Sequence, residues 1–153
     1  MLNPGDIKTI KKTTEEFFQK TTFGVEVEVL PEKEGNIPIN LETEEPQILI
    51  GEGGQTLAEI QHLLKAILKR KISEPFYISL DINNYKQKKY EYLKELARST
   101  ADEVALAGKE KELQPMPAHE RRIIHLELSN RSDIITESLG QEPERKVVIR
   151  PKL

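Results

Sequence analysis

Two short stretches of this sequence carry residue types that could contact a polyanion. In the first, Gly51 and Gly54 enclose Glu52 and Gly53, and an amphipathic segment follows. Glycines permit a tight turn, and the free N–H groups at the start of the next helix would point at that turn and could stabilise a phosphate. A helix–turn–helix corner would need the same glycines for packing, so the spacing alone does not choose between the two interpretations.

The side chains within this turn weaken the prediction that it binds a phosphate. Glu52 stands at one of the two middle positions, with Gly53 at the other, and a carboxylate lowers the affinity for a second anion. Two alternatives therefore stay open for residues 51–54: a weak nucleic-acid clamp, or a turn with a structural role only.

The second stretch contains an arginine and a histidine four residues apart. At this spacing Arg121 and His125 share one face of a helix, and we expect both side chains to converge at the surface. Arginine offers a planar fork of donors to a phosphate or a base edge, and histidine can stack on a base or donate a hydrogen bond. Arg122, Arg145 and Lys146 would add positive field. The alternative is an arginine that stacks on its own helix beside a histidine that packs.

Other chemistry is excluded or unsupported by the spacing. His119, Glu120 and His125 resemble a zinc-protease motif, but the two histidines are six residues apart and lie about 120° from each other around a helix, so they cannot bind one ion. The chain has no cysteine, and no nucleophile–base pair is recognisable. We expect no metal, no cofactor and no catalytic activity.

Three lysines, Lys86, Lys88 and Lys89, admit two interpretations. They could extend a track of phosphate contacts beside Arg121, or they could form an ordinary solvated helix face that Glu91 and Glu95 balance. The second interpretation is favoured, because runs of charge are usually solvated faces.

The overall charge is unevenly distributed along the 153 residues. The net charge is −3, but residues 1–83 carry −5 and residues 84–153 carry +2, so a polyanion would meet mainly the second half. No signal peptide and no apolar run of membrane-spanning length are recognisable, which predicts a cytoplasmic protein without membrane insertion.

Hydrophobic periodicity predicts an α+β fold with two domains, residues 1–83 and 84–153. The first domain should be a three-stranded sheet with helices on one face. Its expected elements are a helix capped by Asp6, a hairpin of residues 25–29 and 37–41, a short turn at 48–50, a helix over 55–68 and a strand at 76–80. Pro38 suggests that the second strand lies at a sheet edge or starts late.

The second domain should be a small α+β unit. Its expected elements are a helix over residues 85–107 closed by Gly108, a helix over 117–128, and strands at 134–136 and 147–149.

The motifs in this order resemble a KH domain of bacterial, type II topology followed by an R-3-H domain, a single-strand-binding domain named for its Arg and His. A KH domain followed directly by R-3-H is similar to the Jag family, the SpoIIIJ-associated proteins also called KhpB or EloR. The matching stretches cover nearly the whole chain and comprise the turn at 51–54 and residues 81–85, 96–97, 115–117, 120–125 and 145–149.

The resemblance implies a bacterial RNA-binding protein that is linked to post-transcriptional regulation and cell-envelope growth. In a KH domain the turn clamps about four nucleotides, and its middle positions usually include a basic residue, where this chain has Glu52 and Gly53. Many members also carry an N-terminal Jag domain and a charged linker. Neither is recognisable in this sequence, so we do not expect activities that depend on them.

We therefore expect single-stranded RNA as the partner, with Arg121 and His125 as the binding pair. The alternative is a protein–protein adaptor. Its acidic KH half would pair with another KH-domain protein or with a second copy of this chain, and only the R-3-H half would contact RNA. The acidic turn favours the adaptor, and the Arg121–His125 helix favours the RNA binder.

Overall fold

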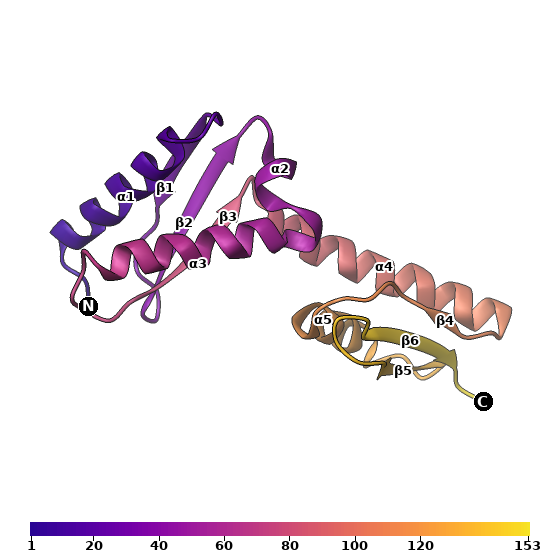
Figure 1. Ribbon diagram of the computed structural model, residues 1–153. Helices are drawn as coiled ribbons and strands as arrows, with labels where there is room; N and C mark the ends of the chain where they lie inside the picture. Colours follow the sequence, from indigo (N-terminus) through magenta and orange to yellow (C-terminus); the bar gives the residue numbers. More distant parts are fainter. The chain divides into compact units, whose positions relative to one another are not determined.

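The computed structural model describes residues 1–153, which divide into two compact units, Met1–Lys86 and Gln87–Leu153 (Figure 1). The elements of the first unit are α1 (Pro4–Gln19), β1 (Val25–Val29), β2 (Asn36–Thr43), α2 (Pro46–Ile50), a 3-10 turn η1 (Glu52–Gly54), α3 (Gln55–Lys69) and β3 (Tyr77–Ile82). The strands form one sheet in the order β1-β2-β3, with β2 antiparallel to β1 and parallel to β3. The predicted α+β class and the order of these elements are confirmed.

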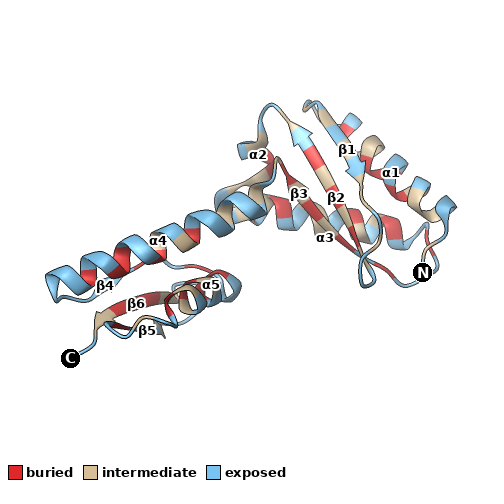
Figure 2. Cartoon of the chain, turned by 180° about the vertical axis from the view of Figure 1, so that it is seen from behind, coloured by how far each residue is buried: buried red, intermediate tan, exposed pale blue.

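Buried and more exposed residues alternate along β2 and β3 (Figure 2). Because successive side chains of a strand point to opposite faces, the buried apolar residues gather on one face of the sheet. Ile37, Ile39 and Leu41 of β2 pack with the inward residues of β3 and with one stripe of α1 and of α3. The opposite face presents carboxylates from all three strands: Glu26, Glu28, Glu42 and Asp81. Four of the fourteen carboxylates of residues 1–83 therefore share one face of the sheet.

Two local expectations for the first unit are wrong. The helix α1 is capped by Asn3, whose side chain accepts from the N–H of Asp6, while the Asp6 carboxylate accepts from the N–H of Asn3. Asp6 is thus the N3 residue of a capping box whose N-cap is Asn3. Pro38 lies in the central strand, where its carbonyl accepts from Leu30. Its missing N–H would face Leu30, just beyond the last paired residue of β1, so the parallel ladder to β3 loses no hydrogen bond.

The second unit contains α4 (Tyr85–Ala107) from Gln87 onward, β4 (Lys111–Glu112), α5 (Ala118–Leu128), β5 (Ile134–Leu139) and β6 (Lys146–Pro151). Its sheet is antiparallel in the order β4-β6-β5. Gly108 ends α4 at φ +67°, and its N–H donates to the carbonyl of Val104. The stripe of α4 that begins at Leu93 packs with Ile124 and Leu128 of α5 and with β6. In neither unit does a helix combine the length and apolar character needed to cross a membrane.

Candidate nucleic-acid interface

Arg121 is held in place by two acceptors from outside its own helix. Its Nε donates to the carbonyl oxygen of Met116 at 3.1 Å, and its Nη2 donates to the carboxylate of Glu142 at 2.9 Å. The residue exposes only 8% of its surface, so the expectation that this side chain lies exposed is wrong. A guanidinium can be buried only when acceptors satisfy its N–H groups. Here the loop before α5 and the loop after β5 supply those acceptors.

His125 joins α5 to the neighbouring strand β5. Its Nδ1 lies 2.8 Å from the hydroxyl of Thr136, and its Nε2 lies 2.8 Å from the hydroxyl of Ser138. Thr136 and Ser138 are two residues apart on a strand and therefore point to the same side. A neutral imidazole has one donor and one acceptor, which matches two hydroxyls that can each play either role.

The protonation of His125 follows from this environment. Burial holds its pKa below the ordinary value of 6.5, and the positive charge of Arg121 lowers the pKa further. The imidazole is therefore neutral at pH 7. Any ligand contact that it makes at that pH is a hydrogen bond or a stacking contact rather than an ion pair.

Arg121 and His125 line one shallow hollow on α5. Its lining consists of Ala118, His119, Arg121, Arg122, His125 and Leu126. Arg122 and His119 are exposed, and neither forms an ion pair or a side-chain hydrogen bond. Leu126 exposes 58% of its surface, although it is a large apolar residue. The hollow thus combines a free cation, a buried cation, two imidazoles and an apolar contact.

Sequence reasoning missed the contributions of His119 and Leu126. It assessed His119 only as a zinc ligand and gave Leu126 no role. The spacing of 119, 122 and 126 places these residues on one helical face, and this pattern could have pointed to them.

Arg145 and Lys146 do not line the hollow. Arg145 Nη1 donates to the carbonyl of Gly140 at 2.7 Å, and the ammonium group of Lys146 is paired with the carboxylate of Glu112. Both are therefore engaged in contacts within the second unit. In this arrangement Arg122 is the one predicted cation of the hollow that has no partner.

The turn at residues 51–54 has the backbone conformation that its glycines allow. Gly51, Gly53 and Gly54 adopt φ values of +74°, +62° and +84°. A Cβ on Gly51 would lie 2.1 Å from the hydroxyl oxygen of Thr56, so this position also excludes a side chain sterically. Gly54 precedes α3, and no side chain caps the first turn of this helix. The N–H of Gln55, the first residue of α3, donates to the carbonyl of the exposed Glu52.

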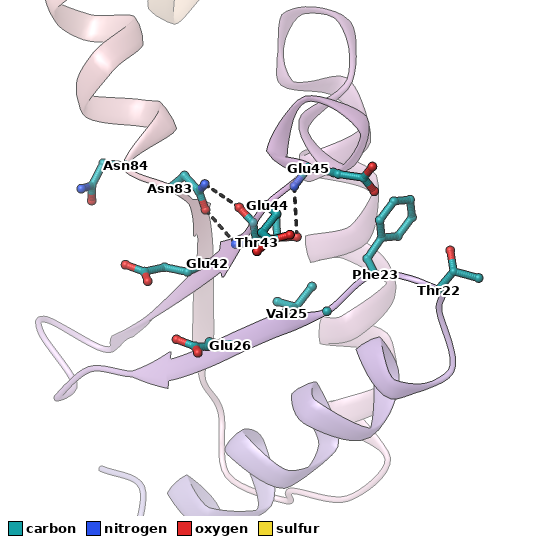
Figure 3. A pocket seen from close by; sticks show the side chains of 11 residues that line it. Thr22, Phe23, Val25, Glu26, Glu42, Thr43, Glu44, Glu45, Asn83 and Asn84 are labelled. Carbon is teal, nitrogen blue, oxygen red and sulfur yellow. Dashed lines mark hydrogen bonds between the residues drawn. The ribbon is translucent and has the colours of Figure 1, made fainter.

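A larger hollow of the first unit has the wrong charge for a polyanion. It is lined by Thr22, Phe23, Gly24, Val25, Glu26, Glu42, Thr43, Glu44, Glu45, Asn83 and Asn84 (Figure 3). The side chain of Asn83 forms two hydrogen bonds to the backbone of Thr43 (Figure 3). Its Oδ1 accepts from the N–H of Thr43 at 3.0 Å, and its Nδ2 donates to the carbonyl of Thr43 at 2.8 Å. Four glutamates around this hollow would repel phosphate.

Comparison with known proteins identifies the second unit. The R-3-H domain family matches residues 91–151, which span most of α4 and all of β4, α5, β5 and β6. The chain is thus an α+β protein with an R-3-H domain in its second half.

Curated relatives extend the likeness across both units. The "RNA-binding protein KhpB" of Clostridium symbiosum is 35% identical over 139 residues, which are 90% of this chain and 63% of that protein. The proteins of the same name from Lactiplantibacillus plantarum and Bacillus subtilis are 37% and 35% identical over 72% and 79% of this chain. The chain belongs to the KhpB family, as the Jag resemblance predicted. It spans 34% to 63% of the length of these relatives.

Proposed function

We propose that this chain binds single-stranded RNA through the hollow on α5. The observation that carries the proposal is that Arg121, Arg122, His119 and His125 all line one hollow at α5, the helix in the middle of the R-3-H domain. Support also comes from the relatives, whose names describe them as RNA-binding proteins. The role is one of binding rather than catalysis.

Each residue of the hollow has a distinct part in this proposal. Arg122 contacts a phosphate first, because it is exposed and unpaired. Arg121 can donate further hydrogen bonds to the RNA from the buried side of the hollow. Its two acceptors within the protein leave part of its five N–H donors unused. His125, which is neutral, contacts a base or a sugar, and Leu126 offers an apolar surface to a base.

The turn at residues 51–54 is proposed as a second and weaker clamp. The start of α3, which no side chain caps, favours an anion through the helix dipole, whereas the carboxylate of Glu52 opposes one. The main RNA contact therefore lies in the second unit. By family likeness the proposal extends to a bacterial regulator that acts after transcription and is linked to cell-envelope growth.

A second candidate function is a protein–protein adaptor in which the first unit pairs with another KH-domain protein or with a second copy. The acidic open face of the first sheet favours this role, because its four carboxylates repel nucleic acid and suit a partner with positive charge. Under this alternative RNA still contacts the α5 hollow.

Fluorescence anisotropy with a labelled single-stranded oligouridine at several salt concentrations tests the proposal. Arg122→Ala should weaken binding and reduce the slope of log affinity against log salt by about 0.7, the share of one phosphate contact. Lys109→Ala is the matched control, since Lys109 is an exposed lysine of the same unit that forms no ion pair and does not line the hollow. If the wild-type chain fails to bind, or if the two variants lose affinity equally, the proposed site is wrong.

A further inference from the structure

The first turns of α4 expose a tyrosine beside two unpaired lysines. Tyr92 exposes 57% of its surface, and the Nζ of Lys89 lies 5.5 Å from the centroid of its ring. Lys88 and Lys89 form no ion pair with a carboxylate. These three residues, Lys88, Lys89 and Tyr92, are called the Tyr92 patch below.

The helix brings the three side chains of the patch together. Lys88 and Lys89 precede Tyr92 by four and three residues, the spacings at which side chains are neighbours on a helix surface. The buried residues of α4 begin only at Leu93. The patch therefore lies at the solvated start of the helix, and the two lysines precede the match to the R-3-H family at residues 91–151.

We propose that the Tyr92 patch is a further binding subsite for single-stranded RNA, where one unpaired base stacks on Tyr92 and Lys88 and Lys89 contact the adjoining phosphates. This inference rests on the proposed function of the chain. Lys89 lies over one face of the phenol ring, and the base uses the other face. Aromatic rings that stack bases and cations that follow the backbone are the two components of single-strand binding.

Two other exposed tyrosines show what distinguishes this patch. Tyr90 also has a lysine over its ring, but the Nζ of that residue, Lys94, lies 3.9 Å from the carboxylate of Glu127. Tyr77 has Lys65 over its ring at 4.5 Å, but its side chain lies on the sheet face that carries Asp81. A phosphate at Tyr90 would therefore meet the carboxylate of Glu127, and one at Tyr77 would approach the acidic face of the first sheet. Glu91 and Glu95, the carboxylates nearest to Tyr92 in the chain, form no ion pair with Lys88 or Lys89.

Anisotropy measurements on the full chain with labelled oligouridine test the subsite. Tyr92→Ala should weaken binding by about five-fold or more and leave the salt slope unchanged, because stacking on a base involves no phosphate. Tyr92→Phe should restore the affinity, since the ring remains. Lys88→Ala combined with Lys89→Ala should reduce the salt slope by about 1.4, the share of two phosphates.

Tyr77→Ala is the matched control, because it removes a ring of similar exposure that also lies under a lysine. Its affinity should equal that of the wild type, and thermal melts should show every variant folded. In a second measurement, photo-crosslinking to bromouridine-substituted oligouridine should label the wild-type peptide that contains Tyr92.

The outcomes separate this inference from the proposed function. If the wild type binds and loses affinity on Arg122→Ala, but Tyr92→Ala binds normally or the Tyr92 peptide is not labelled, the subsite is overturned and the α5 hollow stands. Equal losses for Tyr92→Ala and Tyr77→Ala also overturn it. If the wild type does not bind oligouridine at all, both proposals fail.

Discussion

Replacement of Arg121 by alanine should destabilise the second unit as well as weaken RNA binding. The substitution leaves the carbonyl of Met116 without its donor and removes the ion pair to Glu142. A hydrogen bond from a charged donor contributes about 1.5–3 kcal/mol, whereas an ion pair to a carboxylate as exposed as that of Glu142 adds about 0–1 kcal/mol. The buried aliphatic stem of the arginine adds to the loss.

Together these effects predict that Arg121→Ala lowers the free energy of unfolding by about 2–4 kcal/mol. For a unit of this size each kcal/mol lowers the Tm by roughly 4–8 °C, so the Tm should fall by about 8 °C or more. Arg122→Ala is the paired variant. It removes an exposed and unpaired neighbour and should change the free energy of unfolding by less than about 0.5 kcal/mol.

Urea denaturation followed by circular dichroism measures both stabilities, and anisotropy at a temperature where both variants are folded measures RNA affinity. If Arg121→Ala melts with the wild type, the two hydrogen bonds do not brace the unit and the side chain is free, as the sequence alone suggested. If Arg121→Ala is destabilised but binds oligouridine with unchanged affinity and salt slope while folded, Arg121 is structural only and Arg122 carries the phosphate contact.

Three further predictions concern charge, protonation and backbone conformation. Glu52→Lys should raise the affinity for oligouridine at low salt, because a cation replaces the carboxylate beside the first turn of α3. Unchanged anisotropy would mean that RNA does not approach the turn and would favour the adaptor. His125 should make stability depend on pH: its folded pKa is lowered, so the unfolded chain binds the proton more readily and the free energy of unfolding should fall as the pH drops below about 6.5. His125→Gln should flatten that dependence in urea titrations, and an unchanged profile would assign the effect to other groups. Gly51→Ala should destabilise the first unit by about 2 kcal/mol or more, because its φ is +74° and a Cβ would lie 2.1 Å from Thr56. Gly53→Ala, at φ +62° with no atom within 4 Å, should cost only about 1 kcal/mol, and equal melting temperatures would contradict the steric explanation.

Local patterns predicted most of the secondary structure because the physical causes are local. The helix α4 begins at Tyr85 and ends at Ala107, as expected from its apolar stripe and from Gly108. The strands β1 and β3 follow from the alternation of apolar and polar residues. Pro38 was misjudged because the cost of a missing N–H depends on which neighbour it faces, and strand pairing alone decides that.

The sequence by itself determined the candidate pair, since a spacing of four residues places Arg121 and His125 on one helix face whatever surrounds the helix. It also determined the acidic first half and the glycines that permit the turn at residues 51–54. Only the tertiary structure decided how exposed the pair is. The hydrogen-bond partners of Arg121 and His125 lie 5 to 21 residues away in the chain, on Met116, Thr136, Ser138 and Glu142. Burial and hydrogen bonding depend on which distant segments the fold brings together, and no local spacing encodes that.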